Sequence, residues 1–359
     1  MYMHSRKLIF WGLYFLGTTA FFLLIIEAVL RVFNPLGTDY IYEARRYFKI
    51  MRPDNIYGYI HRAGVKDVFQ DVAVRINNEG FRGREFAVKK PEGVYRVLLL
   101  GDSVVFSWGV HENDSFAVQL EKMLQTKAPR KDIAYEVLPI GVGSWNTRTQ
   151  YEFMVERGIE YHPDLVVWII VANDLEPKSR GRTLVPLNEL RARPQGLETS
   201  RWEKKTETQR RWLAEHSHLW AVVERYRRLG FIRRLNASYV KVGSPQSTDA
   251  KDAINKLSRL LKVNEVPVYA FIHGDNTSDF GLQYQALYQD FLTQAGIPFF
   301  KFPKTIYQRP YLNSLIDPHQ NAKGIRIMVE EVSSKLAAVQ TFKVFSNRYT
   351  ATNQTPSAK

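Results

Sequence analysis

Cysteine is absent from this sequence of 359 residues. Its absence excludes disulfide bonds, thiolate zinc sites, iron–sulfur clusters and a cysteine nucleophile. Three motifs are also missing: the phosphate loop G-x-x-x-x-G-K-[ST], the dinucleotide fingerprint G-x-G-x-x-G and the nucleophile elbow G-x-S-x-G. No carboxylate cluster completes a metal site around the histidines, so we expect no metal and no cofactor.

Acidic residues are fewer than basic ones, with 36 Asp and Glu against 50 Lys and Arg, a net charge of +14. This balance favours anionic surroundings such as lipid headgroups or acidic glycans. A nucleic-acid partner would rest on charge alone, and the membrane segment described next argues against one, so we predict none. The 45% hydrophobic residues indicate a globular protein. The length fits two domains, or one large α/β domain with additions.

The longest apolar run, residues 8–26, contains no charged residue. As a helix it would span roughly 28 Å, close to the ~30 Å hydrocarbon core of a bilayer. We expect the helix to continue to about Phe33, with Glu27 and Arg31 one turn apart in the headgroup zone. No small-residue cleavage site follows, so residues 1–33 are predicted to form an uncleaved signal anchor.

The predicted contact with the lipid bilayer is residues 8–33, a single pass. Arg6 and Lys7 precede the span, which favours a cytoplasmic N-terminus, although basic residues also follow it between positions 31 and 52. We expect the rest of the chain on the periplasmic or cell-surface side.

Two regions flank the main domain. Residues 34–92 are rich in turns and contain one alternating segment, Val72–Ile76, so we predict a small β-containing bridge between the membrane and the main domain. At the other end, residues 341–359 are predicted to form a polar tail.

Between residues 93 and 340, short apolar runs alternate with helical periodicity. Near-continuous apolar strands separated by amphipathic helices predict an α/β fold, a doubly wound, mostly parallel five-stranded sheet with helices on both faces. In such a sheet the ligand site lies beyond the carboxyl ends of the strands. The predicted strands are Val97–Leu100, Val137–Ile140, Leu165–Val171, Val266–Ile272 and Phe299–Phe302.

A basic stretch, residues 178–234, interrupts this alternation directly after the third strand. It contains 15 Lys or Arg and six Glu, a net +9 of the chain's +14. Apolar residues recur at helical spacing from Trp212 to Tyr226. We interpret the stretch as a basic helical insertion over the active end of the sheet; the alternative is a solvated basic face without a ligand.

Small and polar residues follow the first three strands and precede the last helix. They lie in the segments 101–103, 141–144, 172–174 and 317–324. A doubly wound sheet brings these segments to one edge, where they supply a hydroxyl, backbone N–H groups, a carboxamide, an imidazole and a carboxylate. These are the parts of a serine acyl-transfer site.

The chemistry assigns a role to three of these side chains. Ser103 is the candidate nucleophile, and it needs a base, for which His319 is the candidate. Asp317, two residues before the histidine, can orient the imidazole and stabilise the imidazolium.

Attack on an ester carbonyl also creates an oxyanion that needs hydrogen-bond donors. The candidate donors are the N–H of Ser103, a backbone N–H from Gly143 or Ser144, and the side-chain amide of Asn173. Ser103 opens a helix, whose N-terminal dipole favours the developing negative charge.

The order Gly-Asp-Ser, then Gly, then Asn-Asp, then Asp-x-His resembles the SGNH (GDSL-type) hydrolase superfamily, over roughly residues 95–339. The resemblance, to a membrane-anchored bacterial-type member, implies a flavodoxin-like α/β fold. It implies activity as an esterase, a lipase, a carbohydrate O-acetylesterase or an O-acetyltransferase. By position it makes Ser103 the nucleophile, Asn173 an oxyanion donor, His319 the base and Asp317 its orienting partner.

The chain departs from the family pattern at three positions. Ser144 stands where the second block usually has its oxyanion glycine, and Ala172 stands where a glycine usually precedes the asparagine. Ser107 replaces a glycine that is common four positions after the nucleophile. None of these changes removes a catalytic group, but a serine lacks the backbone freedom of glycine.

These observations predict a membrane-anchored serine esterase that hydrolyses O-acyl esters through an acyl-serine intermediate. O-acetyl groups on envelope polysaccharide or lipid are the favoured substrates. One alternative is a polysaccharide O-acetyltransferase that uses the same triad. A second, motivated by the departures, is a catalytically weak glycan-binding or scaffold protein derived from the SGNH fold.

Overall fold

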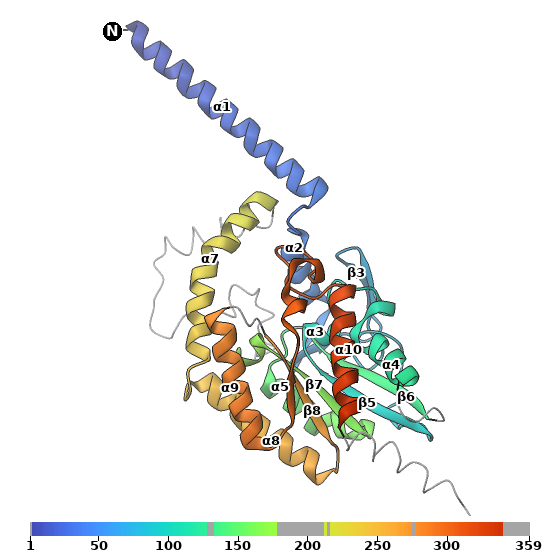
Figure 1. Cartoon of the computed structure of the whole chain (residues 1–359). Helices are drawn as coiled ribbons and strands as arrows, with labels where there is room; N and C mark the ends of the chain where they lie inside the picture. Colours follow the sequence, from blue (N-terminus) through green and yellow to red (C-terminus); the bar gives the residue numbers. More distant parts are fainter. Residues whose placement is uncertain (1, 128–132, 178–211, 214–215, 275–277, 340–359) are drawn as a thin grey trace, which may run out of the picture.

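A five-stranded parallel sheet forms the centre of the part of the chain that the computed structural model describes (Figure 1). Its strand order is β6-β5-β7-β8-β9, which in order of appearance is 2-1-3-4-5, the flavodoxin-like arrangement. The predicted doubly wound sheet is therefore confirmed. The strands are β5 (Val94–Gly101), β6 (Ala134–Gly141), β7 (Leu165–Val171), β8 (Val268–His273) and β9 (Phe299–Lys301). The described residues are 2–127, 133–177, 212–213, 216–274 and 278–339.

Successive side chains of a strand point to opposite sides of the sheet. Because the strands are apolar on both sides, helices cover both faces. In β5, Leu98 and Leu100 are buried in one hydrophobic cluster, and Val97 and Leu99 in another. The first cluster includes residues of α5, α8 and α9, and the second includes residues of α4 and α10. The helices around the sheet are α3 (Ser103–Phe106), α4 (Phe116–Lys127), α5 (Thr147–Phe153), α8 (Pro245–Val263), α9 (Asp279–Ala295) and α10 (Ala322–Ala338).

Polar residues begin several of these helices. Asn146, Ser244, Ser278 and Asn321 each accept a backbone N–H of the first turn through the side chain, at the starts of α5, α8, α9 and α10. Short turns connect the larger elements: η1 (Phe48–Ile50), η2 (Glu112–Asp114), η3 (Met154–Gly158), η4 (Ile159–Tyr161), η5 (Ala172–Leu175), η6 (Lys304–Tyr307) and η7 (Arg309–Tyr311).

Residues 34–92 share the hydrophobic core of the sheet. Tyr47, Tyr59 and Phe69 are buried in the same cluster as Leu98 of β5. A helix, α2, also forms here that the periodicity does not predict, because it has only nine residues and buries one of them, Tyr47. The elements are α2 (Asp39–Tyr47) and two antiparallel hairpins, β1 (Met51–Asp54) with β2 (Gly58–His61) and β3 (Lys66–Phe69) with β4 (Val72–Arg75).

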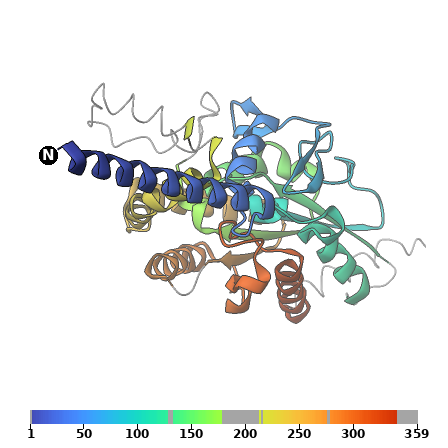
Figure 2. The ribbon, with the colours of Figure 1, turned by 90° about the horizontal axis from the view of Figure 1, so that it is seen from above.

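Helix α1 (Tyr2–Phe33) leaves the domain as a rod whose N-terminal end lies outside the outline of the domain (Figures 1 and 2). Its segment Ile9–Phe33 is long and apolar enough to cross a membrane, and only 6% of its most apolar window is buried in the protein. Of the predicted insertion, α7 (His218–Tyr239) is described, whereas residues 178–211 lie outside the described residues, as does the predicted tail 341–359.

The end of α1 is bonded to the start of α7. The Glu27 carboxylate accepts hydrogen bonds from the hydroxyl of Ser217 (2.8 Å) and from the backbone N–H groups of His218 and Leu219 (both 2.9 Å). The Arg31 guanidinium lies 2.6 Å from the same carboxylate. Glu27 therefore satisfies free N–H groups at the N-terminus of α7, where the helix dipole also favours a negative charge.

We predict that Glu27→Ala lowers the free energy of unfolding by about 1–2 kcal/mol, because it leaves the first N–H groups of α7 without their acceptor. Urea denaturation of the full chain in mild detergent measures the change. The control is Glu331→Ala, which removes an ion pair with Lys335 on the surface of α10 and should cost no more than about 0.5 kcal/mol. Equal effects of the two substitutions would contradict the capping role.

Candidate active site

Ser103 lies at the carboxyl edge of the sheet, on the turn between β5 and α3. Gly101 ends the strand in close contact with β7: an added Cβ would lie 3.0 Å from the carbonyl oxygen of Ile169. Asp102 follows, fully buried, and its Oδ1 accepts the N–H of Val104 (3.0 Å) as the cap of α3. This turn projects the hydroxyl of Ser103 beyond the edge of the sheet.

His319 and Asp317 reach Ser103 from the loop before α10. Nε2 of His319 lies 2.9 Å from Oγ of Ser103, and Nδ1 lies 2.6 Å from Oδ1 of Asp317. A carboxylate only accepts hydrogen bonds, so Nδ1 carries the proton and Nε2 presents its lone pair to the serine hydroxyl. The structure thus brings together three side chains that are up to 216 positions apart in the sequence.

Further hydrogen bonds hold Asp317 in place. Its Oδ2 accepts from Nδ2 of Asn313 (3.0 Å), and the same amide nitrogen donates to the carbonyl of Trp108 (2.9 Å). Its backbone N–H donates to the hydroxyl of Ser314 (2.9 Å). Asp317 is fully buried, so the donors to its carboxylate, which are the amide of Asn313 and the N–H groups of His319, compensate the loss of water around its charge.

The charges around the imidazole shift its equilibrium toward the protonated form. Burial disfavours the imidazolium, but the charge and hydrogen bond of Asp317, with the charge of Asp102, outweigh burial and raise the pKa of His319. Burial likewise opposes ionisation of Asp317, and the charge and hydrogen bonds of His319 outweigh it and lower the pKa of that carboxyl. The pair is therefore arranged as a basic imidazole beside an ionised carboxylate.

Asn173, in the turn η5 after β7, reaches the nucleophile turn. Its Nδ2 donates to Oδ2 of Asp102 (2.8 Å), an oxygen that lies 3.2 Å from Oγ of Ser103. An amide nitrogen has two hydrogens, so the second one remains for an oxyanion formed at Ser103. The structure therefore places the predicted carboxamide donor beside the predicted nucleophile.

The two predicted backbone donors of the second block differ in their surroundings. The N–H of Gly143 donates to the hydroxyl of Tyr47 (2.9 Å), so this group is already used inside the fold. Ser144 is exposed, and its N–H bonds to none of the described residues. Of the two alternatives, the geometry leaves Ser144 as the available backbone donor.

Two serines stand at positions where the resemblance to SGNH hydrolases leads one to expect glycine. Both have the backbone conformation that favours glycine. Ser144 has φ 64° and Ser107 has φ 59°, both in the left-handed region. Ser107 also ends α3 and accepts the N–H of Phe116 through its hydroxyl (2.9 Å). Both serines therefore have a left-handed conformation that glycine adopts without a steric cost.

A buried polar chain, which the sequence motifs do not indicate, holds the second block. Tyr47 of α2 bonds to Nε2 of His61 (2.6 Å), and Nδ1 of His61 donates to the carbonyl of Gly80 (2.8 Å). Burial lowers the pKa of His61 to about 4, so the ring is neutral and its Nε2 accepts a hydrogen bond from the Tyr47 hydroxyl. Tyr59 donates to the carbonyl of Gly143 (2.9 Å). Residues of the 34–92 region thus fix both polar groups of Gly143.

Aromatic and basic side chains surround His319. Tyr40 of α2 meets its ring edge-on at 5.8 Å, and Trp108 lies at 6.4 Å. Arg225 of α7 lies 6.0 Å from the Tyr40 ring and donates to the carbonyl of Ile316 (2.7 Å). None of these side chains stands in a catalytic motif, so the sequence pattern carries no signal for them.

Asp174 has a structural environment. It is fully buried and accepts hydrogen bonds from Nε2 of Gln150 (2.8 Å) and the N–H of Val171 (2.7 Å). Burial and the charge of Asp102 raise its pKa well above the usual range. In the described part of the chain, no three His, Cys, Asp or Glu residues lie together as metal ligands.

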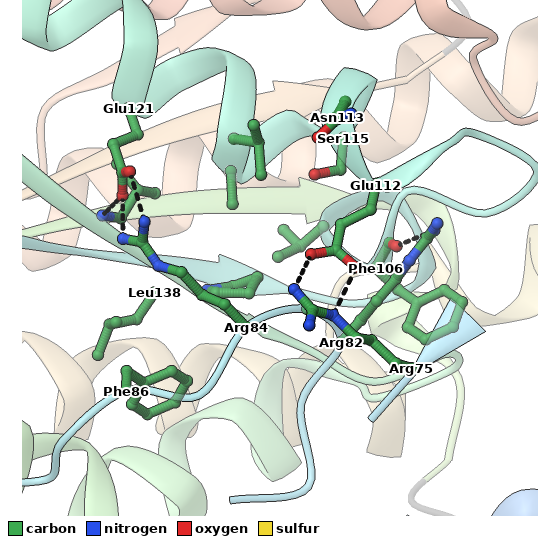
Figure 3. Close-up of a pocket in the computed structure, with 16 residues that line it drawn as sticks. Arg75, Arg82, Arg84, Phe86, Phe106, Glu112, Asn113, Ser115, Glu121 and Leu138 are labelled. Carbon is green, nitrogen blue, oxygen red and sulfur yellow. Dashed lines mark hydrogen bonds and ion pairs between the residues drawn. The ribbon is translucent and has the colours of Figure 1, made fainter. Parts of the chain in front are cut away.

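A separate cavity of about 220 Å³ lies between α3, α4, β6 and the segment 82–86 (Figure 3). Its charges pair with one another, Arg75 with Glu112 and Arg84 with Glu121 (both 2.6 Å). Arg82 donates to the carbonyls at the end of α3, including that of Ser107 (2.6 Å). None of Ser103, Asp317 and His319 lines this cavity.

No protein-family model and no curated protein sequence matches the chain. Among solved structures, the chain is similar to the acetyl xylan esterase AlAXEase, with 15% identity and a TM-score of 0.41 over 68% of this chain and 100% of that one. It is similar to AlinE4, an SGNH-hydrolase family esterase, with 15% identity and a TM-score of 0.36 over 69% and 97%. The esterase EstA from Pseudoalteromonas sp. has 10% identity and a TM-score of 0.39 over 68% and 99%.

All three of these similar structures are esterases by name.

We predict that Tyr47→Phe lowers the free energy of unfolding by about 1–3 kcal/mol, because it leaves the buried N–H of Gly143 without an acceptor. The matched control is Tyr284→Phe, since the Tyr284 hydroxyl is buried without a hydrogen-bond partner among the described residues. That control should change stability by no more than about 0.5 kcal/mol. Urea denaturation compares the two variants, and equal losses would contradict the role of Tyr47.

Proposed function

We propose that the protein is a membrane-anchored serine esterase that hydrolyses O-acyl esters, with O-acetyl groups favoured, through an acyl-serine intermediate. The observation that carries the proposal is the continuous hydrogen-bonded series from Oγ of Ser103 through both nitrogens of His319 to Asp317, at 2.9 and 2.6 Å. This is the geometry that a hydroxyl needs in order to become a nucleophile at neutral pH.

In the first half-reaction, Nε2 of His319 takes the proton of Ser103 while Oγ forms a bond to the ester carbonyl carbon. The carbonyl oxygen becomes an oxyanion, which the N–H of Ser103, the N–H of Ser144 and the amide of Asn173 stabilise. When the tetrahedral intermediate breaks down, the bond to the alcohol oxygen is cleaved and the imidazolium returns its proton to that oxygen. The alcohol leaves and the acyl group remains on Ser103.

In the second half-reaction, water replaces the alcohol. His319 takes a proton from the water, whose oxygen attacks the acyl carbon, and Oγ of Ser103 leaves with that proton. The acid product is released and the enzyme returns to its starting state. An alcohol in place of water would give transfer, so analysis of the products with an added glycan acceptor distinguishes hydrolysis from transfer.

The contacts at the end of α1 support anchoring by an uncleaved helix. A signal sequence that is removed would take Glu27 and Arg31 with it, together with the cap of α7. The apolar length of Ile9–Phe33 matches the hydrocarbon thickness of a bilayer. The net charge of +14 favours an acyl-bearing substrate in anionic surroundings, such as envelope polysaccharide or lipid outside the cytoplasm.

A serine-directed fluorophosphonate probe tests the proposal. We expect the folded wild type to be labelled at Ser103, and Ser103→Ala to remain unlabelled. Ser103→Ala and His319→Ala should each lower kcat on an acetyl ester by about 10³ or more, and the double variant should be little worse, because the triad acts as one unit. An unlabelled wild type would favour a scaffold role, and losses that multiply in the double variant would contradict the assigned roles.

The pH dependence follows from the raised pKa of His319. The base must be neutral, so kcat/KM should fall as the pH drops through a midpoint above the ordinary histidine value of about 6.5. Asp317→Asn removes the charge that raises this pKa, so the midpoint should move to lower pH. Its kcat should fall by about 10³–10⁴, because the imidazole loses its partner.

Rates measured between pH 5 and 9 give the midpoint. Asp249→Asn, which removes an exposed carboxylate paired with Arg148, is the control and should leave the profile unchanged. A midpoint that does not move in Asp317→Asn would show that His319 is not the titrating base.

A further inference from the structure

The loop that carries Asp317 and His319 is bonded directly to the segment that follows the membrane helix. The N–H of Ile316 donates to the carbonyl of Leu36 (3.2 Å). Gly37 packs so closely on Ser314 that any Cβ there would overlap the serine side chain. Helix α1 ends at Phe33, and three residues extend at most about 11 Å. The catalytic loop is therefore held within that reach of the end of α1.

Two further connections join the same loop to α1. Tyr40, seven residues beyond the end of the helix, contacts the ring of His319. The first N–H of helix α7 donates to Glu27 of α1, and Arg225 of α7 donates to the carbonyl of Ile316. In Figure 1 the end of α1, the start of α7 and helix α2 all lie toward the carboxyl edge of the sheet. The triad thus lies on the side of the domain from which the membrane helix departs.

Exposed apolar side chains lie on these same segments. Leu315, between the two residues that contact positions 36 and 37, is 53% exposed. Trp212, which stacks on His216 just before α7, is 58% exposed, and Tyr226 on α7 is 66% exposed. Aromatic residues next to a membrane helix are suited to the headgroup region, because one end of each ring is apolar and the other is polar.

We propose that the substrate is an amphiphile held in the same bilayer as the enzyme, which presents its ester at the headgroup level to Ser103. This inference rests on the proposed function and names its substrate class. The ester that is cleaved either joins an acyl chain to a membrane lipid or joins an acyl group to the headgroup of a lipid. Anchoring both molecules in one surface raises their effective concentration, whereas a freely dissolved polymer would gain nothing from a triad placed beside the anchor.

The test uses the full chain reconstituted in phospholipid vesicles, with the outward-facing enzyme counted by fluorophosphonate labelling. The lipid probe is an acetylated fluorogenic phenol coupled to the headgroup of phosphatidylethanolamine. The soluble probe is 4-nitrophenyl acetate. At equal total concentrations, we expect the lipid probe to be hydrolysed at least tenfold faster when it shares the vesicles with the enzyme than when it is in separate vesicles. Released acetate indicates an acylated headgroup, and released fatty acid indicates a lipid acyl chain.

A pair of variants tests the surface itself. Leu315→Asp should lower the ratio of lipid-probe to soluble-probe hydrolysis at least fivefold, because a charge disfavours contact with the bilayer. The matched control is Val242→Asp, which changes an 86% exposed apolar residue at the opposite end of α7 from Glu27 and should leave the ratio unchanged.

The outcomes separate this inference from the proposed function. Ser103-dependent hydrolysis of 4-nitrophenyl acetate with no advantage for shared vesicles would overturn the membrane-held substrate and leave the esterase standing. An unchanged ratio in Leu315→Asp would overturn it in the same way. Hydrolysis of neither probe by the wild type would overturn both.

Discussion

The buried carboxylate of Asp102 is the group on which the arrangement of the site depends. One oxygen caps α3 through the N–H of Val104, and the other lies 2.8 Å from the amide of Asn173 and 3.2 Å from the hydroxyl of Ser103. A buried charge needs several hydrogen-bond donors. The turn after β5 and the turn after β7 each supply one to Asp102, from Val104 and Asn173. The same charge helps to raise the pKa of His319. One acidic group therefore caps the turn that carries Ser103, orients the amide of Asn173 and helps to raise the pKa of His319.

The sheet and the triad could be predicted because their signals are local. Each buried strand is a short apolar run, and the polar residues that carry chemistry follow such runs directly, as Ser103 and Asn173 do. Parallel strands place their carboxyl ends at one edge, so the pattern predicts proximity without any knowledge of side-chain positions. Asp317 and His319 follow from the same logic, since they stand before the last helix of the same edge.

The other features of the candidate site depend on contacts between residues that are far apart in the sequence, which a local sequence pattern does not reveal. Whether Gly143 or Ser144 offers a free N–H is decided by the Tyr47 hydroxyl, 96 positions away from Gly143. Aromatic residues such as Tyr40 and Tyr47 are typical of an ordinary core, and only the fold shows that Tyr40 contacts the ring of His319 and that Tyr47 accepts the N–H of Gly143. Arg225 is one of many arginines in a basic stretch, and its contact with the catalytic loop is a property of where α7 packs.

Helix α1 is bonded to the domain at its C-terminal end. The Glu27 carboxylate accepts hydrogen bonds from two backbone N–H groups of α7 and from the hydroxyl of Ser217 just before that helix, and it pairs with the guanidinium of Arg31. Removing α1 would take away the acceptor of the N–H groups of His218 and Leu219, and α7 is the helix whose Arg225 donates to the carbonyl of Ile316, close to His319. The end of α1 and the loop that carries Asp317 and His319 are therefore connected through one helix, α7.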